Sequence, residues 1–256
     1  MVGKSKKKLI TSLSQKKYRD RTGLFVAEGP KLVNDLLASG LQPELLFSTG
    51  EDILTSQSHE LTPEIIDDQS LKKISFLKSP QNVLAVFKKP AERFHFGDHA
   101  NRLTLALDGV RDPGNMGTIL RLADWFGFSH IVCSHDSADV FNPKVVQASM
   151  GALGRVTVHY TELDAFCRQS SEELKMPVFG TFMDGENIYT TSLPSQGLIV
   201  MGNEGSGITH AVQKTLTSRL SIPSFGEHPH SGMESLNVAM ATAVVCAEFR
   251  RQNMFA

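Results

Sequence analysis

A glycine-rich loop and a few polar side chains near it are the residues of this chain best suited to chemistry. The apolar run Leu198–Met201 predicts a buried strand that leads into glycines at positions 202, 205 and 207. Such glycines permit positive φ and let a ligand approach the backbone closely. The spacing is GxxGxG, which is neither the GxGxxG of dinucleotide-binding folds nor a P-loop. By itself the loop indicates only an α/β domain with a ligand-facing turn.

Two other segments carry polar side chains that could act beside this loop. One is the turn Asp108–Gly114, which precedes a predicted helix over Asn115–Phe126. The other is the start of a helix that is predicted to begin at an N-cap, Ser235, and to run to about Gln252. Asn and Ser commonly cap turns and helices, so a purely structural duty stays open for each candidate. The polar candidates on the three segments are Asn115, Glu204, Ser235 and Asn237.

Arg121 lies on the outer face of the helix predicted over Asn115–Phe126. The opposite face gathers the apolar side chains that should pack on the sheet, and Trp125, the only tryptophan, lies near Arg121. A solvated arginine is the simplest interpretation, but Trp and Arg are both enriched in the cores of interfaces. The apolar side chains of this helix are Met116, Ile119, Leu120, Ala123 and Phe126.

Strands alternate with helices through the second half of the chain, which predicts a mostly parallel sheet covered on both faces. The predicted strands are Leu103–Leu107, Ile131–Ser134, Val156–His159, Val178–Phe182, Leu198–Met201 and Leu220–Ile222. The predicted helices are Asn115–Phe126, Lys144–Ala152, one from Leu163, Thr209–Ser218 and the last helix, which is apolar almost all round and should be buried on more than one side.

The first 88 residues predict a smaller α/β domain. Its predicted strands are Leu24–Ala27, Glu44–Ser48 and Val83–Phe87, with a helix from Pro30 to Gly40 and another starting within Pro63–Asp68. Residues 89–101 show no apolar period and are interpreted as a linker. The predicted domains are therefore 1–88 and 102–256.

Composition narrows the class of protein. The 256 residues are 41% hydrophobic and 21% charged, which is typical of a soluble globular chain. No apolar run approaches membrane length and no signal peptide is visible. The three cysteines lack CxxC spacing, so buried thiols and a cytoplasmic location are expected. His228 and His230, with Glu227, form a lone HxH in a loop, which is weak evidence, and no metal is predicted.

Charge is distributed unevenly between the start of the chain and the rest. Up to Arg21 there are eight Lys or Arg against Asp20 alone, a net charge of +7, whereas the whole chain carries −1 and the remainder therefore −8. A basic block on an acidic body indicates phosphate contacts. For Lys4–Lys8 a solvated tail stays an equal alternative. RNA contact is favoured for the residues next to predicted structure, namely Lys16, Lys17, Arg19 and Arg21.

Three ordered motifs resemble those of the SpoU (TrmH-like) RNA ribose 2′-O-methyltransferases of the SPOUT superfamily, over roughly Leu103–Gln252. They are DGVRDPGNMGTILRLADWFG, then NEGSG, and then the pair Ile222-Pro223 followed by SLNVA. Less specifically, KKYRDRTGLFVAEGPKLVNDLL and SPQNVLAVF resemble the L30e-like RNA-binding domain that precedes the catalytic domain in many of these enzymes. The segment Phe225–Glu234 departs from the family pattern, being longer than the usual connection by roughly five residues.

The resemblance implies an S-adenosylmethionine (AdoMet)-dependent methyltransferase acting on a ribose 2′-hydroxyl of rRNA or tRNA. It also implies a homodimer and a C-terminal trefoil knot, a feature otherwise nearly absent from folds. The implied catalytic residues are Arg121, Asn115, Glu204, Ser235 and Asn237. The implied cofactor contacts are Met201, Gly202, Asn203, Gly207, Ile222, Pro223 and Leu236, although core packing is the alternative for Ile222 and Leu236.

The role of Arg121 is open between two chemistries. The family's matching arginine is proposed to activate the ribose hydroxyl, sometimes as a general base, whereas a charged guanidinium could orient the hydroxyl and stabilise developing negative charge. Two other functions compete with the methyltransferase: a non-catalytic RNA-binding protein on the same scaffold, and a Rossmann-type oxidoreductase, which the missing GxGxxG disfavours.

Overall fold

The computed structural model describes residues 2–51, 62–91, 94–225 and 235–254. Within it the chain forms two compact units, one made of residues 1–92 with 139–155 and the other of 93–138 with 156–256. The predicted boundaries at 88 and 102 divide the chain into two consecutive segments. In the structure, contacts place the internal segment 139–155 with the first unit. No helix in the described ranges is long and apolar enough to cross a bilayer.

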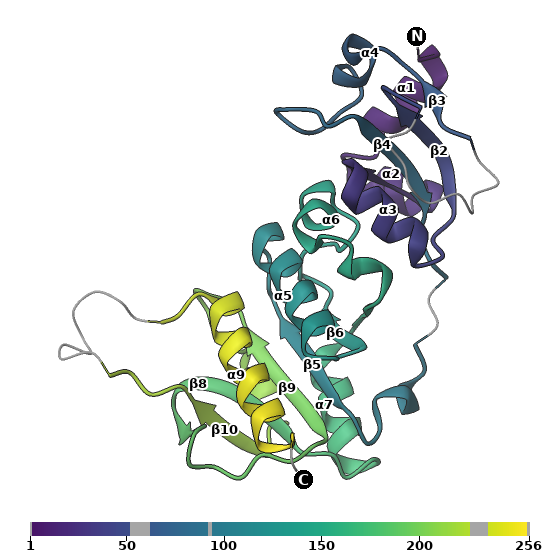
Figure 1. Ribbon diagram of the computed structural model, residues 1–256. Coiled ribbons are helices and arrows are strands. Elements are labelled where there is room, and N and C mark those ends of the chain that lie inside the picture. Colours follow the sequence, from purple (N-terminus) through teal and green to yellow (C-terminus); the bar gives the residue numbers. More distant parts are fainter. Residues whose placement is uncertain (1, 52–61, 92–93, 226–234, 255–256) are drawn as a thin grey trace. The chain divides into compact units, whose positions relative to one another are not determined.

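The first unit is a four-stranded sheet with helices packed around it (Figure 1). The strand order is β1-β4-β2-β3, antiparallel except for the short parallel pairing of β2 with β3. The strands are β1 (Leu24–Glu28), β2 (Pro43–Ser48), β3 (Glu64–Ile65) and β4 (Val83–Lys88). The helices are α1 (Lys4–Ser12), α2 (Lys16–Thr22), α3 (Pro30–Ala38), α4 (Asp68–Lys72) and, from the internal segment, α6 (Pro143–Ser149) and the 3₁₀ turn η2 (Ala152–Gly154).

Local interactions define the fold of two further segments of this unit. The helix expected to start within Pro63–Asp68 begins at Asp68, because Glu64 and Ile65 pair with β2 and the Asp67 side chain accepts a hydrogen bond from the Ser70 amide as N-cap. Lys4–Lys8 lie in helix α1, whose Ile10 is buried in the core of the unit, and phosphate contact by these lysines stays a prediction.

Arg19 is not available for RNA contact, which corrects its predicted role. Its side chain is only 2% exposed and donates to Asp139 at 2.9 and 2.6 Å and to the Leu13 carbonyl at 2.8 Å. The pair therefore joins α2 to the internal segment 139–155 inside the same unit. Local charge pattern shows a basic residue at this position but carries no sign of its acidic partner 120 residues away.

Breaking this buried ion pair is expected to destabilise the first unit strongly. Arg19→Ala should lower the free energy of unfolding by about 3–5 kcal/mol, because an uncompensated carboxylate stays buried. The exposed pair between Lys88 and Glu44 serves as the control, since Lys88→Ala should cost at most about 1 kcal/mol. Urea unfolding of both variants measures the difference, and equal small losses would show that the Arg19 pair contributes no more than a surface contact.

The second unit is a six-stranded, wholly parallel sheet with the order β10-β8-β9-β5-β6-β7. This confirms the predicted mostly parallel α/β architecture. The strands are β5 (Leu103–Asp108), β6 (His130–Ser134), β7 (Thr157–Thr161), β8 (Val178–Asn187), β9 (Gly197–Gly202) and β10 (Ser218–Ser221). The helices are the 3₁₀ turn η1 (Phe96–His99), α5 (Pro113–Trp125), α7 (Leu163–Glu172), α8 (His210–Gln213) and α9 (Val238–Gln252).

The two central strands, β5 and β9, are buried along nearly their whole length, as strands covered on both faces must be. Ala106, Val200 and Phe166 belong to a core that α7 and α8 cover. Helices α5 and α9 pack against each other, and α9 contacts β9 (Figure 1). The predicted inner face of α5 is confirmed, since Met116, Ile119, Leu120 and Ala123 are fully buried.

Residues 94–101, predicted as part of a linker, pack into this second unit instead. The Phe94 ring stacks on His159 at 4.8 Å between centroids, and the fully buried His99 lies 4.7 Å from Phe166 and hydrogen-bonds Ser170 at 2.9 Å. The prediction failed because these aromatic side chains have neither helical nor strand spacing. They bury apolar surface from an irregular segment, which periodicity cannot detect.

Helix α9 packs against both α5 and β9, in line with the expected burial on more than one side, while one strip of its surface stays exposed. Val245, Cys246 and Phe249 lie in the core, but Met240 is 61% exposed. The three cysteines are free and buried, as predicted, and burial raises the pKa of Cys167 and Cys246 to about 12. Their thiols are therefore protonated and unreactive at neutral pH.

Candidate active site

The loop after β9 closes on itself because residue 202 has no side chain. A Cβ added to Gly202 would lie 2.4 Å from the Gly207 carbonyl carbon and 2.5 Å from the Ile208 nitrogen. This close approach lets Asn203 and Gly207 exchange two backbone hydrogen bonds, of 3.1 and 2.9 Å. Gly207 has φ +68°, which favours glycine. Glycines 202 and 207 therefore shape the loop itself, before any ligand is considered.

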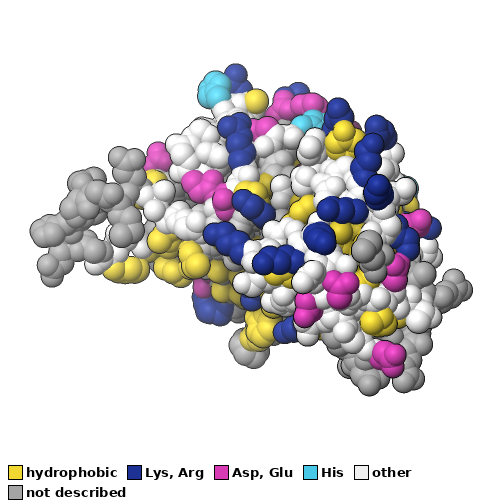
Figure 2. Space-filling model, turned by 90° about the horizontal axis from the view of Figure 1, so that it is seen from above, with side chains coloured by type: hydrophobic (Ala, Val, Ile, Leu, Met, Phe, Trp, Pro, Cys, Tyr) yellow, Lys and Arg dark blue, Asp and Glu magenta, His cyan; other side chains and the backbone are white. Residues whose placement is uncertain are grey.

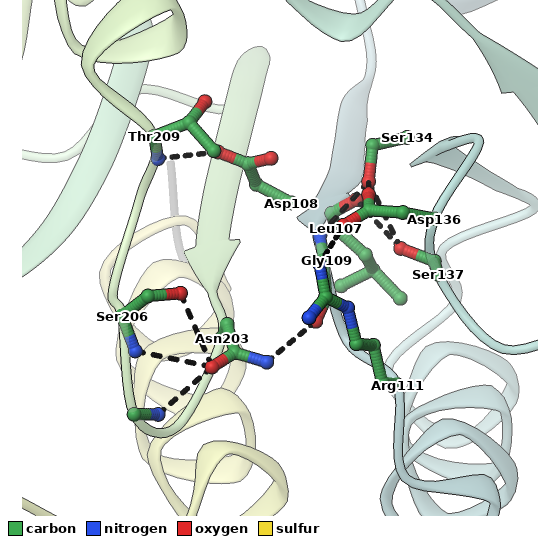
Figure 3. Close-up of polar contacts among 11 residues, drawn as sticks. Leu107, Asp108, Gly109, Arg111, Ser134, Asp136, Ser137, Asn203, Ser206 and Thr209 are labelled. Atoms are coloured by element: carbon green, nitrogen blue, oxygen red, sulfur yellow. Dashed lines mark hydrogen bonds and ion pairs between the residues drawn. The ribbon is translucent and has the colours of Figure 1, made fainter.

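Asn203 ties this loop to the turn after β5 (Figure 3). Its side-chain oxygen accepts from the amides of Gly205 and Ser206 at 2.9 and 3.1 Å, and its side-chain nitrogen donates to the Gly109 carbonyl at 2.8 Å. The amide group of Asn203 is thus used within the protein. Asn203 therefore fixes the shape of the loop, and its place beside the cofactor stays a prediction.

Asp108, at the end of β5, also links the β9 loop to this edge of the sheet. Its buried carboxylate accepts from the Thr209 amide at 2.7 Å (Figure 3). The next residue, Gly109, has φ +70° and donates to the Ser134 hydroxyl at 2.8 Å. Asp108 is therefore a positioning residue that was not predicted from the sequence, although its place at the carboxyl end of a strand was a usable signal.

Arg111 and Asp136 close this network on its outer side (Figure 3). Asp136 accepts from Ser134 and from Arg111, both at 2.6 Å. The Ser134 hydroxyl and the Arg111 guanidinium hold the pKa of the Asp136 carboxyl below its usual value. Asp136 is therefore ionised at neutral pH and keeps Arg111 beside the turn that follows β5.

The side chains of Asn115 in the first turn of α5, Glu204 in the β9 loop and Asn237 at the start of α9 meet one another. The Asn115 side-chain nitrogen donates to the Glu204 carboxylate, and its oxygen accepts from the Asn237 side chain at 3.0 Å. Glu204 and Asn237 are exposed and Asn115 is half-buried, so a ligand can reach all three side chains. The contacts orient a carboxylate and two amides at one point, which suits them to position a hydroxyl group of a substrate.

Asn237, not Ser235, is the N-cap of α9, which corrects the prediction. The Asn237 side-chain oxygen accepts from the amides of Ala239 and Met240 at 3.0 and 3.3 Å. Ser235 and Leu236 precede the cap and are exposed, Leu236 to 48%. One side chain therefore both starts the helix and holds Asn115.

These two duties of Asn237 can be separated by substitution. Asn237→Ala should cost about 0.5–2 kcal/mol of unfolding free energy because the helix cap is removed. Asn237→Ser should restore most of that stability, because serine caps as well as asparagine, yet it cannot reach Asn115 with a donor amide. Thermal unfolding beside an activity assay measures both duties. Full activity in the serine variant would show that the Asn115 contact is dispensable.

Arg121 is exposed on α5, as the helical wheel predicts, but the single chain does not bring it to Asn115. Six residues of α-helix separate the two by about 9 Å along the axis, and the side chains leave on different faces. Within the described ranges no hydrogen bond or ion pair holds its guanidinium. In the part of the chain that the structure describes, Arg121 is thus a free cation on the outer face of α5, near the 85%-exposed Trp125.

The remaining predicted cofactor contacts differ in their access to a ligand. The Met201 side chain is 1% exposed and contacts Thr181, so only its backbone faces the loop. Ile222 and Pro223, which follow β10, are half-buried. His228, His230 and Glu227, with most of the Phe225–Glu234 insertion, lie outside the described residues. No group of three metal-binding side chains occurs among the residues that were placed.

The topology explains why these loops share one edge. Strands β5 and β9 are parallel neighbours, with Asp108 beside Gly202 in register. From β5 the chain continues to β6 on one side, and from β9 it continues to β10 on the other. Ligands of open α/β sheets bind at the carboxyl ends of strands where the order reverses in this way.

Comparison with known proteins decides the family. Residues 102–247 match the model of the SpoU rRNA Methylase family, and residues 4–85 match the MRM3-like substrate binding domain. The chain belongs to the SpoU rRNA methylase family. The site described above lies within the matched range.

Individual relatives agree with this assignment. The chain is 29% identical to the Bacillus subtilis 23S rRNA (guanosine(2553)-2′-O)-methyltransferase RlmP, over 93% of both chains. A structure from Porphyromonas gingivalis, described as a candidate RNA methyltransferase of the TrmH family, is 41% identical with a TM-score of 0.85 and covers 98% of this chain and 99% of its own. An AdoMet-bound rRNA methyltransferase from Sinorhizobium meliloti is 29% identical with a TM-score of 0.83, covering 98% and 97%.

Proposed function

We propose that this SpoU-family chain is an AdoMet-dependent methyltransferase that methylates a ribose 2′-hydroxyl of rRNA or tRNA. The observation that carries the proposal is the convergence of Asn115, Glu204 and Asn237 at the switch point of a SpoU-family sheet. Relatives with similar length and sequence are named for 2′-O-methylation of rRNA and for AdoMet binding.

The residues around the β9 loop fit AdoMet. A Cβ at Gly207 would meet nothing within 4 Å, so the loop backbone there faces open space. Leu236 offers an exposed apolar surface, and the half-buried Ile222 and Pro223 leave part of their surface open to a ligand. When bound, AdoMet supplies an electrophilic sulfonium methyl group.

The protein's own residues would position the ribose and stabilise its charge. Asn115 and Glu204 hold each other in place, so they can orient the hydroxyl without reorganising. Ser235 stands two residues before Asn237 on the same exposed segment and adds a hydroxyl. Arg121 carries the guanidinium that orients the hydroxyl and adjacent phosphate and stabilises the developing alkoxide.

RNA affinity would come largely from the first unit. Lys16, Lys17 and Arg21 are exposed on α2, and the last two lie 5.4 and 4.8 Å from the centre of the Tyr18 ring. Figure 2 shows a face on which Lys and Arg side chains are frequent, with Asp and Glu among them. Cations beside an aromatic ring suit a phosphate backbone with unstacked bases.

Replacing Lys16, Lys17 and Arg21 by alanine together should weaken RNA binding at all sequences. The slope of log affinity against log salt should fall by roughly 0.7–0.9 for each phosphate that the variant no longer neutralises. Fluorescence anisotropy with an rRNA fragment at several salt concentrations measures this, with the exposed pair Lys72 and Lys73 replaced as the control. An unchanged slope in the triple variant would contradict the assignment.

We also propose a homodimer, a C-terminal trefoil knot and a cytoplasmic location. The dimer is supported by the exposed apolar side chains of Trp125 on α5 and Met240 on α9, two helices that pack together. Such surface needs a partner. Light scattering at micromolar concentration tests the dimer, and a monomer would refute it. The knot is proposed on family resemblance.

A direct transfer assay tests the proposed activity. The protein is incubated with methyl-labelled AdoMet and total RNA, with Asn115→Ala as a matched variant. Label in the RNA with the wild type, and little with the variant, supports the proposal. RNA binding without transfer by the wild type would favour the non-catalytic alternative.

A further inference from the structure

A pocket in the first unit is lined by none of the residues of the site described above and has no assigned role. Its volume is about 310 Å³, which is near the lower limit of small-ligand pockets. It is formed by the end of β1, the segment after α4 and one face of α6. The lining residues are Val26, Glu28, Phe76, Leu77, Pro143, Lys144, Gln147 and Ala148.

Glu28 is the unusual group in this pocket, because it is a carboxyl that is only 4% exposed. One oxygen accepts from the Phe76 amide at 2.8 Å and the other accepts from the Ser75 hydroxyl. Burial raises the pKa of Glu28, and these two hydrogen bonds act against that rise. Each carboxylate oxygen has a second acceptor site, so two further donors can be bound side by side.

The other lining residues indicate what kind of molecule could supply those two donor groups. Val26, Leu77 and Pro143 supply apolar walls, and the half-buried Phe76 supplies an aromatic ring. Gln147 adds an amide that can donate or accept. Lys144 lines the pocket yet is exposed, which places a positive charge at its rim. The set suits a flat, partly apolar molecule with paired N–H donors and a neighbouring negative charge.

We propose that this pocket binds an unpaired guanine of the substrate RNA, with its phosphate near Lys144. Guanine is the RNA base whose Watson–Crick edge carries an imino and an amino N–H next to each other, which matches the two free acceptor sites of Glu28. Uracil presents one N–H between two carbonyls, and those carbonyls would face the carboxylate. RNA is read in this way, by splayed bases that stack on aromatic rings and bond through their Watson–Crick edges.

The inference rests on RNA being the substrate, as proposed above, but not on the chemistry at Asn115. Calorimetric titration of the full chain with guanosine 5′-monophosphate and with uridine 5′-monophosphate tests the base preference. The guanine nucleotide should bind at least tenfold more tightly. Glu28→Gln should remove most of this preference, because the amide loses one acceptor oxygen. Equal binding of the two nucleotides, or an unchanged preference in Glu28→Gln, would overturn the proposal.

If Glu28→Gln does not fold, two further variants still test the proposal. Gln147→Leu preserves volume on a half-buried helical position and should weaken guanine binding several-fold. Lys144→Ala should weaken nucleotide binding, whereas Lys78→Ala, an exposed lysine outside the pocket, should not. Equal effects of Lys144→Ala and Lys78→Ala would count against the rim contact and the proposal.

A binding experiment with RNA hairpins tests whether the pocket binds a base within RNA or only a free nucleotide. Two hairpins that differ only by G or U in the loop are compared, and the proposal predicts tighter binding of the G hairpin, with no such preference in Glu28→Gln. Equal binding of both hairpins overturns the proposal even if the free nucleotide binds. Methyl transfer without any guanine preference would contradict guanine binding in the pocket and leave the proposed function standing. Guanine binding without methyl transfer would support the pocket and contradict the proposed function.

Discussion

Replacing Gly202 by alanine is expected to weaken AdoMet binding by roughly 5–150-fold, corresponding to about 1–3 kcal/mol of backbone strain. The reason is internal to the loop, since the new Cβ would lie 2.4 and 2.5 Å from backbone atoms of Gly207 and Ile208. The loop would have to open, and its backbone groups would leave their places. Isothermal titration calorimetry with AdoMet measures the loss.

Gly205→Ala is the matched control in the same loop. The nearest atom to an added Cβ there is the Asn203 side-chain oxygen at 3.6 Å, and Gly205 does not have a positive φ. This variant should bind AdoMet nearly as the wild type does. Equal affinities for the Gly202 and Gly205 variants would show that closure of the loop has no bearing on the cofactor site.

Arg121→Ala is expected to reduce methyl transfer by about 10²–10³-fold, while AdoMet affinity and stability stay close to wild type. A loss of that size follows from removing one group that stabilises developing negative charge. Because Arg121 is exposed and lies on the outer face of α5, its removal leaves the core intact. Arg121→Lys should restore little, since an ammonium lacks the planar fork of donors. Arg168→Ala, at another exposed arginine, is the control.

In the proposed homodimer, the position of Arg121 predicts that it acts in the active site of the other protomer. Mixing Arg121→Ala with Gly202→Ala under conditions of subunit exchange should restore activity, because one pocket of the heterodimer then has both an intact arginine and an intact loop. No recovery after confirmed exchange would mean that each protomer uses its own Arg121.

The parallel sheet of the second unit could be predicted because its strands are continuous apolar runs separated by helical segments. The observed boundaries of some elements differ from the predicted ones where pairing between strands sets them. Strand β8 extends to Asn187 because β10 pairs with it there, and the helix expected over Thr209–Ser218 shortens to His210–Gln213 because β10 starts at Ser218. Such pairings join residues far apart in the sequence, so local pattern cannot show them.

Site residues that lie in family motifs could be predicted from the sequence. Residues whose role depends on a contact with a distant part of the chain could not. Asn115, Glu204 and Asn237 were selected and do meet. Asp108 was missed, since a buried strand-end carboxylate has no motif of its own without knowledge of the Thr209 amide it holds. Arg19 was misassigned because local charge suggests solvent, whereas Asp139 removes it from the surface.

The position of the transferred methyl group tests the central claim most directly. RNA labelled by the wild-type protein with methyl-labelled AdoMet is hydrolysed in alkali, which cleaves RNA only where the 2′-hydroxyl is free. Ribose 2′-O-methylation predicts that the label is recovered in alkali-stable dinucleotides and, after nuclease digestion, in 2′-O-methylnucleosides. Recovery of the label in alkali-labile mononucleotides that carry a methylated base would contradict the account.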